Sequence, residues 1–334
     1  MTTNPAHEAW LATTVEEAID PDLPICDPHH HLWHHPTDPY LLEHLHADTG
    51  AGHNVVETVF VDCMAEYRTE GPEHLRPVGE TAWVAKLAAE SEAGDGATIA
   101  GIVGFADLTL GAAVEEVLAA HVEAGDGRFR GIRHASSWDA SPDVRNAHTS
   151  PPEGLLGQGD FRAGLATLGR MGLSFDAWMY HPQLGELVDL ARAHPDVTMV
   201  LDHLGGPLGI GPYAGRRDEV RAAWEAPMAD LAADCPNVVL KLGGIGMAVY
   251  GLAWHREPTA PTSDALAEAW GPQIEWCIER FGPDRCMFES NFPVDRRSCS
   301  YVVLWNAFKR IAGGCSDSER APLFRDTARA AYRL

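Results

Sequence analysis

A histidine cluster at positions 29–31 is the first group of residues in the sequence that could do chemistry. The preceding segment, 25–28, is a short Ile-Cys-Asp-Pro lead. If a β-strand ends here, His29 and His31 lie on one face, because side chains alternate with a period of two, and His30 points the other way. Two imidazoles on one face can bind a metal ion or polarise a carbonyl group. The alternative is a surface histidine run, which the further histidines just downstream leave open.

The elements that would position these histidines follow a regular alternation. Short apolar runs rich in β-branched residues recur along the chain, and each is followed by a stretch with helical periodicity. The runs are 25–27, 55–62, 98–106, 129–133, 174–178, 197–202, 238–242 and 286–290. The predicted helices are 77–92, 112–123, 161–171, 182–193, 218–233, 265–281 and 301–311, with a short first helix at 41–46.

This alternation predicts an α/β protein with a parallel sheet. Eight strand and helix units favour a (β/α)8 TIM barrel over an open doubly wound sheet. The sequence also lacks the glycine-rich fingerprints of nucleotide-binding sheets, which removes the main support for that alternative.

In a barrel of this kind the active site lies at the carboxyl ends of the strands. Polar residues stand at or just after most of the predicted strands: His29, His31, Asp62, Arg133, His134, Trp178, His181, Asp202, His203, Lys241, Glu289 and Asn291. We therefore predict that His29, His31 and His203 converge. Each of the three could instead be a hydrogen-bonded core histidine.

The length and composition of the chain restrict its organisation and partners. The 334 residues suit one domain, with residues 24–334 forming the barrel and residues 1–23 an N-terminal extension. A formal net charge of −23 argues against nucleic acid as a partner. No targeting segment or membrane-spanning run is evident, so we expect no membrane association and a cytoplasmic protein. Trp10 and Trp305 suggest a possible homo-oligomer.

Four motifs carry a resemblance to a known family. They are Asp-x-His-x-His-Leu-Trp at 27–33, Gly-Ile-Arg-His at 131–134, Val-Leu-Asp-His-Leu-Gly-Gly-Pro at 200–207 and Arg-Cys-Met-Phe-Glu-Ser-Asn-Phe-Pro-Val-Asp at 285–295. Together they resemble the amidohydrolase-related (amidohydrolase 2) family of TIM-barrel hydrolases. The nearest likeness is to the branch with pyrone dicarboxylate lactonase and sugar-acid lactonases. Residues 327–334 resemble the family's C-terminal helix.

The resemblance implies a pocket in which His29, His31 and His203 contact a metal or the substrate carbonyl. One divalent ion (zinc, manganese or iron) is the cofactor it suggests. A metal-free site, in which the imidazoles donate hydrogen bonds to the carbonyl, is the alternative. Arg133 would suit a substrate carboxylate, because its planar fork binds one bidentately, unless it forms an ion pair between strands. Lys241 is a second cationic candidate.

The last strand departs from the family pattern. Members usually carry an aspartate there that ligates metal and deprotonates water, and the matching residue is Asn291. An amide cannot accept a proton near neutral pH, so Asn291 can at most orient water or ligate weakly. Glu289, two residues earlier on the same face, is our first choice for the base, and Asp295 is the second. Glu289 could instead be a buried ion-pair partner of Lys241 or Arg133, and Asp295 a loop carboxylate.

Further residues are candidates for the pocket wall. Trp33 and Trp178 would bind a flat or cyclic substrate, although large rings more often serve packing. His181, after the fifth strand, and Arg68, after the second, are further candidates for substrate contacts.

These features together predict a hydrolase that opens a lactone or related carbonyl bond in a small carboxylated, and therefore anionic, substrate. One alternative is a metal-dependent decarboxylase of an aromatic acid. Another is a catalytically silent binding protein with the same fold.

Overall fold

The computed structural model describes residues 5–334 and contains one sheet of eight parallel strands in the order β1 to β8. The strands are β1 (Pro24–His30), β2 (Asn54–Val61), β3 (Thr98–Gly104), β4 (Phe129–Arg133), β5 (Ser174–Ala177), β6 (Met199–Leu201), β7 (Val238–Leu242) and β8 (Cys286–Phe288). All eight predicted strands are confirmed. β1 is longer than predicted because it continues through Pro28 to His30. β6 begins two residues later and ends one residue earlier than predicted, and β8 ends two residues earlier.

The sheet is nearly closed between β8 and β1. Residue pairing there is limited to a bridge between His30 and Phe292. The backbone N–H of His31 donates to the carbonyl of Phe292 at 2.8 Å, and that of Asn291 donates to the carbonyl of His29 at 2.9 Å. The closing hydrogen bonds therefore lie beside the predicted site and fix the histidine segment against the end of β8.

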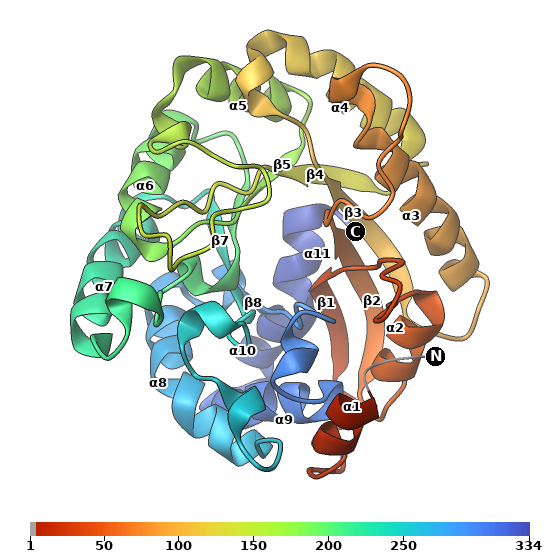
Figure 1. Ribbon diagram of the computed structural model, residues 1–334, viewed down its shortest axis with the longest axis vertical. Helices are drawn as coiled ribbons and strands as arrows, with labels where there is room; N and C mark the ends of the chain where they lie inside the picture. Colours follow the sequence, from red (N-terminus) through yellow and green to blue (C-terminus); the bar gives the residue numbers. More distant parts are fainter. Residues whose placement is uncertain (1–4) are drawn as a thin grey trace.

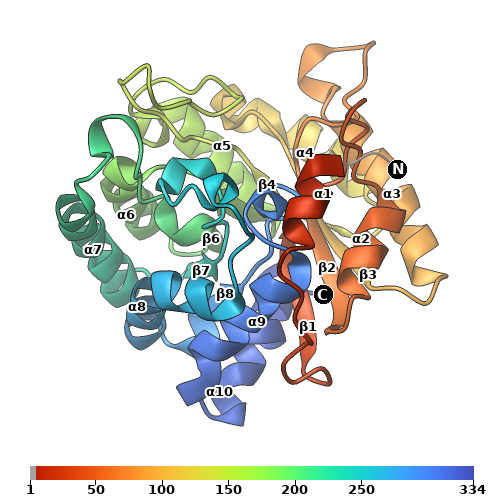
Figure 2. The same cartoon turned by 60° about the horizontal axis from the view of Figure 1, so that its bottom comes forward.

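Helices surround the strands as an outer ring (Figures 1 and 2). They are α1 (Pro5–Leu11), α2 (Leu42–Thr49), α3 (Val78–Glu92), α4 (Val114–Ala124), α5 (Gly159–Arg170), α6 (Leu184–Ala193), α7 (Arg217–Asp234), α8 (Ser263–Phe281), α9 (Tyr301–Ile311) and α10 (Asp317–Ala321), and a further helix is α11 (Thr327–Tyr332). The large hydrophobic core lies between this ring and the outward faces of the strands. The fold is the predicted (β/α)8 TIM barrel, built because each amphipathic helix covers one strip of sheet.

α11 does not belong to the outer ring. It lies within the ring of strands (Figure 1). Its residues Ala328, Ala331 and Tyr332 form a second core cluster with the inward-facing side chains Cys26, Val59, Val61, Val103, Val200 and Met287. The C-terminal helix suggested by the family resemblance is thus present, and it fills the interior of the barrel.

Residues 5–23 pack on the barrel of their own chain. The indole N–H of Trp10 donates to the carbonyl of Glu257, and the ammonium of Lys309 donates to the carbonyls of Ile19 and Asp20. Trp305 is fully buried in the core, so the surface association suggested for it is wrong. None of the helices in residues 5–334 combines the length and apolar character needed to span a bilayer.

Candidate active site

The three predicted histidines meet at the carboxyl ends of β1 and β6. The Nε2 atoms of His29 and His31 are 3.3 Å apart, and the ring centroids of His29 and His203 are 4.6 Å apart. His30 points elsewhere and contacts the hydroxyl of Thr58. The structure therefore brings together residues from opposite sides of the barrel, as the pattern of strand ends indicated.

The partners of the ring nitrogens define how the imidazoles are protonated. Nδ1 of His31 lies 2.7 Å from the carbonyl oxygen of Val61, and Nδ1 of His203 lies 2.7 Å from Glu289 Oε1. Nδ1 of His29 lies 2.8 Å from Glu289 Oε2. Because carbonyl and carboxylate oxygens only accept, Nδ1 of His31 and Nδ1 of His203 carry the proton and their Nε2 atoms keep the lone pair. Nδ1 of His29 also lies 3.1 Å from Nζ of Lys241, which only donates, so this nitrogen faces both a donor and an acceptor.

Burial keeps the paired imidazoles of β1 neutral. It lowers the pKa of His29 well below its usual range, with a further contribution from the charge of Lys241. Burial and the charge of Arg133 do the same for His31. A neutral imidazole with a protonated Nδ1, as in His31, offers Nε2 as an acceptor or metal ligand.

Glu289 is the residue that fixes two of these imidazoles. It is fully buried, and its two carboxylate oxygens face His29 and His203. Burial alone would raise the pKa of Glu289, but His203 and His29 outweigh it and lower the pKa to about 2. A carboxylate with so low a pKa is a poor base near neutral pH. We therefore assign Glu289 a positioning role in place of the predicted role as the base.

The pKa of Asp295 is shifted in the opposite direction, upward. Its Oδ1 accepts from the side-chain amide of Asn291 at 2.9 Å, and its Oδ2 accepts from the backbone N–H of Gly246 at 2.8 Å. Burial raises the pKa of Asp295 to about 7, in spite of these donors. A carboxyl group with a pKa near 7 can accept a proton at neutral pH and release it again.

Unusual backbone conformations aim the side chains at the ends of β6 and β8. His203 has φ 55° and Asn291 has φ 54°, both in the left-handed region that non-glycine residues rarely adopt. His203 is held there by Tyr250, whose hydroxyl donates to its carbonyl oxygen at 2.5 Å. Gly244 leaves room for the ring, because a Cβ at this position would lie 2.1 Å from His203 Nδ1.

Lys241 lies beneath the three histidines, and its side chain does not contact solvent. Its ammonium is fully buried, 2.8 Å from Asp176 Oδ2 and 2.9 Å from Asp202 Oδ1. Burial would lower the pKa of Lys241, but Asp176 and Asp202 raise it, so the side chain stays charged. The hydroxyl of Tyr332, on α11, also donates to Asp176 at 2.6 Å. Two carboxylates hold Lys241 in the interior, 3.1 Å from Nδ1 of His29, so contact of Lys241 with substrate stays a prediction.

Arg133 lies at the edge of the group formed by His29, His31 and His203, called the histidine group below. Its Nη1 is 3.3 Å from Nε2 of His29 and 3.8 Å from Asp202 Oδ2, and its Nη2 donates to the backbone carbonyl of Asp62. The residue is 6% exposed, and its Nη1 is the cationic group in contact with Nε2 of His29.

The other predicted contact residues divide into two groups. The ring of Trp178 lies 4.7 Å from that of His203, and the ring of Trp33 lies 6.1 Å from that of His31, so both indoles border the site. His181 is buried and accepts from the N–H of Leu208, which holds the loop after β6. Arg68 is exposed on the loop after β2. No contact described within residues 5–334 joins either His181 or Arg68 to the three histidines.

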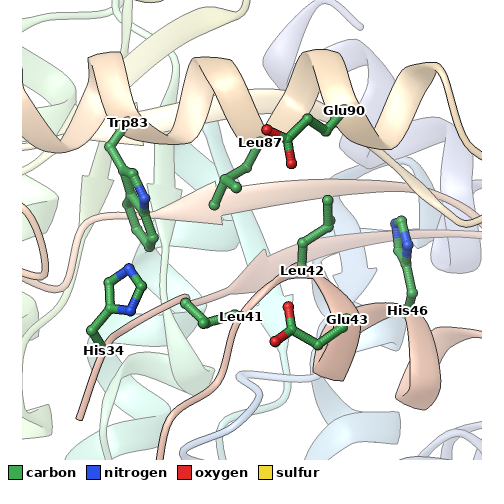
Figure 3. Close-up of a pocket in the computed structure, with 8 residues that line it drawn as sticks. All are labelled: His34, Leu41, Leu42, Glu43, His46, Trp83, Leu87 and Glu90. Carbon is green, nitrogen blue, oxygen red and sulfur yellow. The ribbon is translucent and has the colours of Figure 1, made fainter. Parts of the chain in front are cut away.

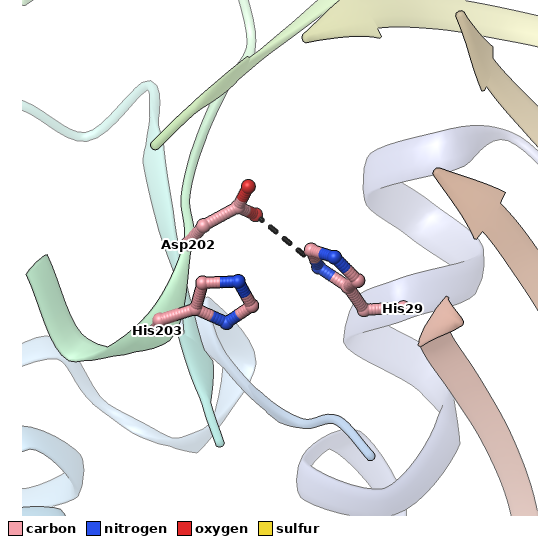
Figure 4. Close-up of side chains that lie close together, drawn as sticks. All are labelled: His29, Asp202 and His203. Atoms are coloured by element: carbon pink, nitrogen blue, oxygen red, sulfur yellow. Dashed lines mark ion pairs between the residues drawn. The ribbon is translucent and has the colours of Figure 1, made fainter. Parts of the chain in front are cut away.

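The residues present fit a divalent metal ion. His29, Asp202 and His203 each offer a ligand atom, and these atoms lie within 4.8 Å of one another (Figure 4). Asp202 Oδ2 is buried without a hydrogen bond. The 3.3 Å between the Nε2 atoms of His29 and His31 is also close to the spacing of two nitrogen ligands at about 2.0–2.1 Å from one tetrahedral zinc.

The predicted metal set and the observed group differ by one residue. His31 lies outside the group of three, and Asp202 takes part instead. Asp202 stands between β6 and His203 in the sequence. Strand alternation places successive side chains on opposite faces, so it does not predict that Asp202 and His203 both turn inward. The left-handed backbone of His203 makes that possible.

A separate cavity of about 300 Å³ lies on the outside of the barrel, between α2 and α3 (Figure 3). Its lining contains His34, Leu41, Leu42, Glu43, His46, Trp83, Leu87 and Glu90. None of the predicted site residues is among them. The chemistry suggested by the histidines therefore has no connection with this cavity.

A (β/α)8 barrel with converging imidazoles, buried carboxylates and a possible metal site at its strand ends defines a class of barrel enzymes related to hydrolases. The model of the family described as amidohydrolase matches residues 26–334. The chain therefore belongs to the amidohydrolase family, as its motifs indicated.

Three relatives show the range of the similarity. An uncharacterized protein of Sinorhizobium fredii, y4mH, is 33% identical over 94% of this chain and 99% of its own length. The L-fucono-1,5-lactonase of Burkholderia multivorans is 30% identical over 76% of this chain and 77% of its own. A crystal structure of an amidohydrolase from Burkholderia multivorans with bound zinc superposes with a TM-score of 0.70 at 26% identity, covering 93% of this chain and 99% of that one.

Proposed function

We propose that the protein is a lactonase that opens the ring of a small anionic cyclic ester with an activated water molecule. The observation that carries this proposal is the Asn291–Asp295 pair, which supplies a buried carboxyl with a pKa of about 7 beside the histidine group. The 30% identity to an L-fucono-1,5-lactonase supports the same reaction type.

In the proposed reaction, Asn291 and Asp295 act on the water. One N–H of the Asn291 amide donates to Asp295, and the side-chain oxygen accepts a hydrogen bond from water. As the water oxygen attacks the lactone carbonyl, its proton passes to Asp295. The carbon to ring-oxygen bond then breaks, and the ring oxygen takes the proton back from Asp295 and leaves as the hydroxyl of the ring-opened acid.

The remaining residues bind and orient. Arg133 anchors an anionic group of the substrate, and the indoles of Trp33 and Trp178 border the ring. Glu289 orients His29 and His203 through its contacts with their Nδ1 atoms.

His29, His203 and Asp202 would hold the metal, with His31 beside them. A divalent ion there would supply Lewis acidity toward the carbonyl oxygen. The bound zinc in the Burkholderia structure supports a divalent ion as the cofactor.

The test is a substrate screen that separates hydrolysis from the alternatives. Purified protein is incubated with a panel of 1,5- and 1,4-aldonolactones and carboxylated pyrones, and acid release is followed with a pH indicator and by NMR. Ring-opened product that disappears in Asp295→Asn supports the proposal. Carbon dioxide released from aromatic acids, with all lactones left intact, would replace it with decarboxylation. Ligand binding without any turnover would replace it with a silent pocket.

A further inference from the structure

We propose that the N-terminal helix α1 positions Asp295, the base of the proposed reaction, by holding the next residue in the chain, Arg296. Asp295 belongs to a single turn of 3₁₀ helix, Asp295–Arg297, in the loop after β8. Helix α1 comes from the other end of the chain and contacts this turn through His7 and Glu8. These contacts are called the α1 clamp below. The catalytic part of the inference rests on the proposed function, whereas the clamp itself does not.

The α1 clamp holds both the side chain and the backbone of Arg296. The guanidinium donates to both carboxylate oxygens of Glu8, from Nη2 to Oε2 at 2.7 Å and from Nη1 to Oε1. The ring of His7 donates from Nε2 to the backbone carbonyl of Arg296 at 2.9 Å. A bidentate pair of this kind fixes the orientation of the two groups as well as their distance. The side chains are 20% and 36% exposed, so solvent ions screen the pair less than a fully exposed one.

The opposite side of the same turn faces the candidate active site. Asp295 is fully buried, and its carboxylate accepts from Asn291 and from the backbone of Gly246. Ser298, directly after the turn, donates from its hydroxyl to the carbonyl of Gly246 at 2.6 Å. The turn is therefore held from the inside by the loop after β7 and from the outside by the α1 clamp.

The turn needs this support because it is short. A 3₁₀ turn has poorer hydrogen-bond geometry than an α-helix, and a single helical turn is unfavourable on its own. Within the turn, the backbone N–H of Ser298 donates to the carbonyl of Asp295 at 2.8 Å. Since Asp295 and Arg296 are consecutive, a fixed guanidinium restricts the backbone that carries the base. Displacement of a reacting group by about 1 Å can lower a rate by about 100-fold.

Helix α1 is attached to the barrel independently of Arg296. The indole N–H of Trp10 donates to the carbonyl of Glu257 at 2.9 Å, and the hydroxyl of Thr14 donates to the carbonyl of Ala260 at 2.6 Å. These contacts keep α1 in place beside the turn. Loss of the Glu8 carboxylate should therefore loosen the turn without releasing the helix.

The first measurement is hydrogen–deuterium exchange of the full chain by mass spectrometry, which does not depend on activity. Glu8→Gln keeps the size of the side chain and removes its charge. We expect amide exchange in peptides covering residues 292–300 to become about threefold to fivefold faster, as for a partly exposed pair, and exchange in β1 and β6 to stay the same. Glu219→Gln breaks a similar bidentate pair with Arg216 beside α7 and is the matched control.

The second measurement is the kinetics of lactone hydrolysis. Glu8→Gln should lower kcat by about threefold to tenfold with KM nearly unchanged, because the clamp acts on the base and on no substrate contact. Glu8→Arg should lower kcat further, since two guanidinium groups then repel each other. The exchanged pair Glu8→Arg/Arg296→Glu should recover part of the loss in both measurements. Glu219→Gln should leave kcat unchanged.

The two measurements separate the clamp from the reaction. Circular dichroism and urea unfolding establish that each variant is folded. Equal exchange at residues 292–300 in Glu8→Gln and Glu219→Gln would overturn the clamp, whatever the reaction is. Faster exchange with unchanged kcat would overturn its role in positioning the base. Faster exchange in Glu8→Gln, when the wild-type protein opens no lactone, would support the clamp and count against the proposed function alone.

Discussion

The side-chain amide of Asn291 donates a hydrogen bond to Oδ1 of Asp295. This contact explains how the end of β8 can lack the aspartate expected from the family resemblance and still have a carboxyl group beside the histidines. Asn291 cannot take up a proton, but it fixes the residue that can. In the proposed reaction the carboxyl group therefore comes from the loop, four positions after Asn291.

The first prediction concerns the pH dependence of hydrolysis. Because only the ionised form of Asp295 accepts a proton, we expect kcat/KM to rise with pH and to level off above its pKa of about 7. Asp295→Asn should remove this limb and lower kcat by about 10²–10⁴-fold. Asn291→Asp places a second carboxylate beside Asp295, so the limb should move to higher pH. A limb near pH 7 that persists in Asp295→Asn would exclude Asp295 as the base.

The second prediction concerns Glu289 as a positioning residue. Glu289→Gln keeps the shape but loses the charge that orients His29 and His203. We expect divalent metal affinity, measured by calorimetry, to fall by about 10–100-fold. Glu279→Gln, an exposed position on α8, is the matched control. Equal metal affinity in the two variants would contradict the assignment.

A third prediction uses two glycines in the same backbone conformation. Gly244 has φ 67° and Gly215 has φ 74°, so alanine is strained at both, by roughly 1–2 kcal/mol. An added Cβ at Gly244 would also meet the ring of His203, whereas at Gly215 nothing lies within 4 Å. We expect Gly244→Ala to lose most lactonase activity and Gly215→Ala to keep it at similar stability. Equal activity in both variants would show that the fit around His203 has no role.

Removal of the buried ammonium provides a fourth prediction. Lys241→Met leaves Asp176 and Asp202 without their cation in the barrel interior. The free energy of unfolding in urea should fall by about 3–5 kcal/mol, as for other buried pairs that lose one partner. Lys241→Met/Asp176→Asn removes one of the stranded carboxylates and should recover part of this loss. A double variant that is less stable than the single one would contradict the interpretation.

The fifth prediction concerns metal content. Protein purified without affinity histidines or chelators should contain a near-stoichiometric divalent transition metal by elemental mass spectrometry. The content should fall strongly in Asp202→Asn and in His29→Ala/His31→Ala, because these changes remove ligand atoms of the buried group. Metal-free wild-type protein with full lactonase activity would instead favour Arg133 as the group that polarises the carbonyl.

The barrel itself could be predicted from sequence because each strand is a short apolar run that both faces bury. β4 and β7 match their predicted bounds, as does α9. The convergence of His29 and His203 followed from the rule that strand ends meet at one face of a barrel.

The pairing of charges within the site could not be predicted in the same way. Strand alternation allows Glu289 to face Lys241 or Arg133, but the residue faces two imidazoles because Asp176 and Asp202 already hold Lys241. At His203 and Asn291 the left-handed backbone also ends the alternation on which such arguments depend. Local sequence gives no indication of these long-range choices.

The position of α11 inside the barrel has a consequence for synthesis on the ribosome. Cys26 and Tyr332 share one core cluster, although roughly 300 residues separate them, and such distant contacts form late and slowly. A nascent chain that has emerged through β8 already contains every residue of the histidine group, but Val59, Val61 and Val103 still lack their cover. Until α11 leaves the exit tunnel, the incomplete barrel exposes these apolar side chains. Exposed apolar surface of this kind is what chaperones bind.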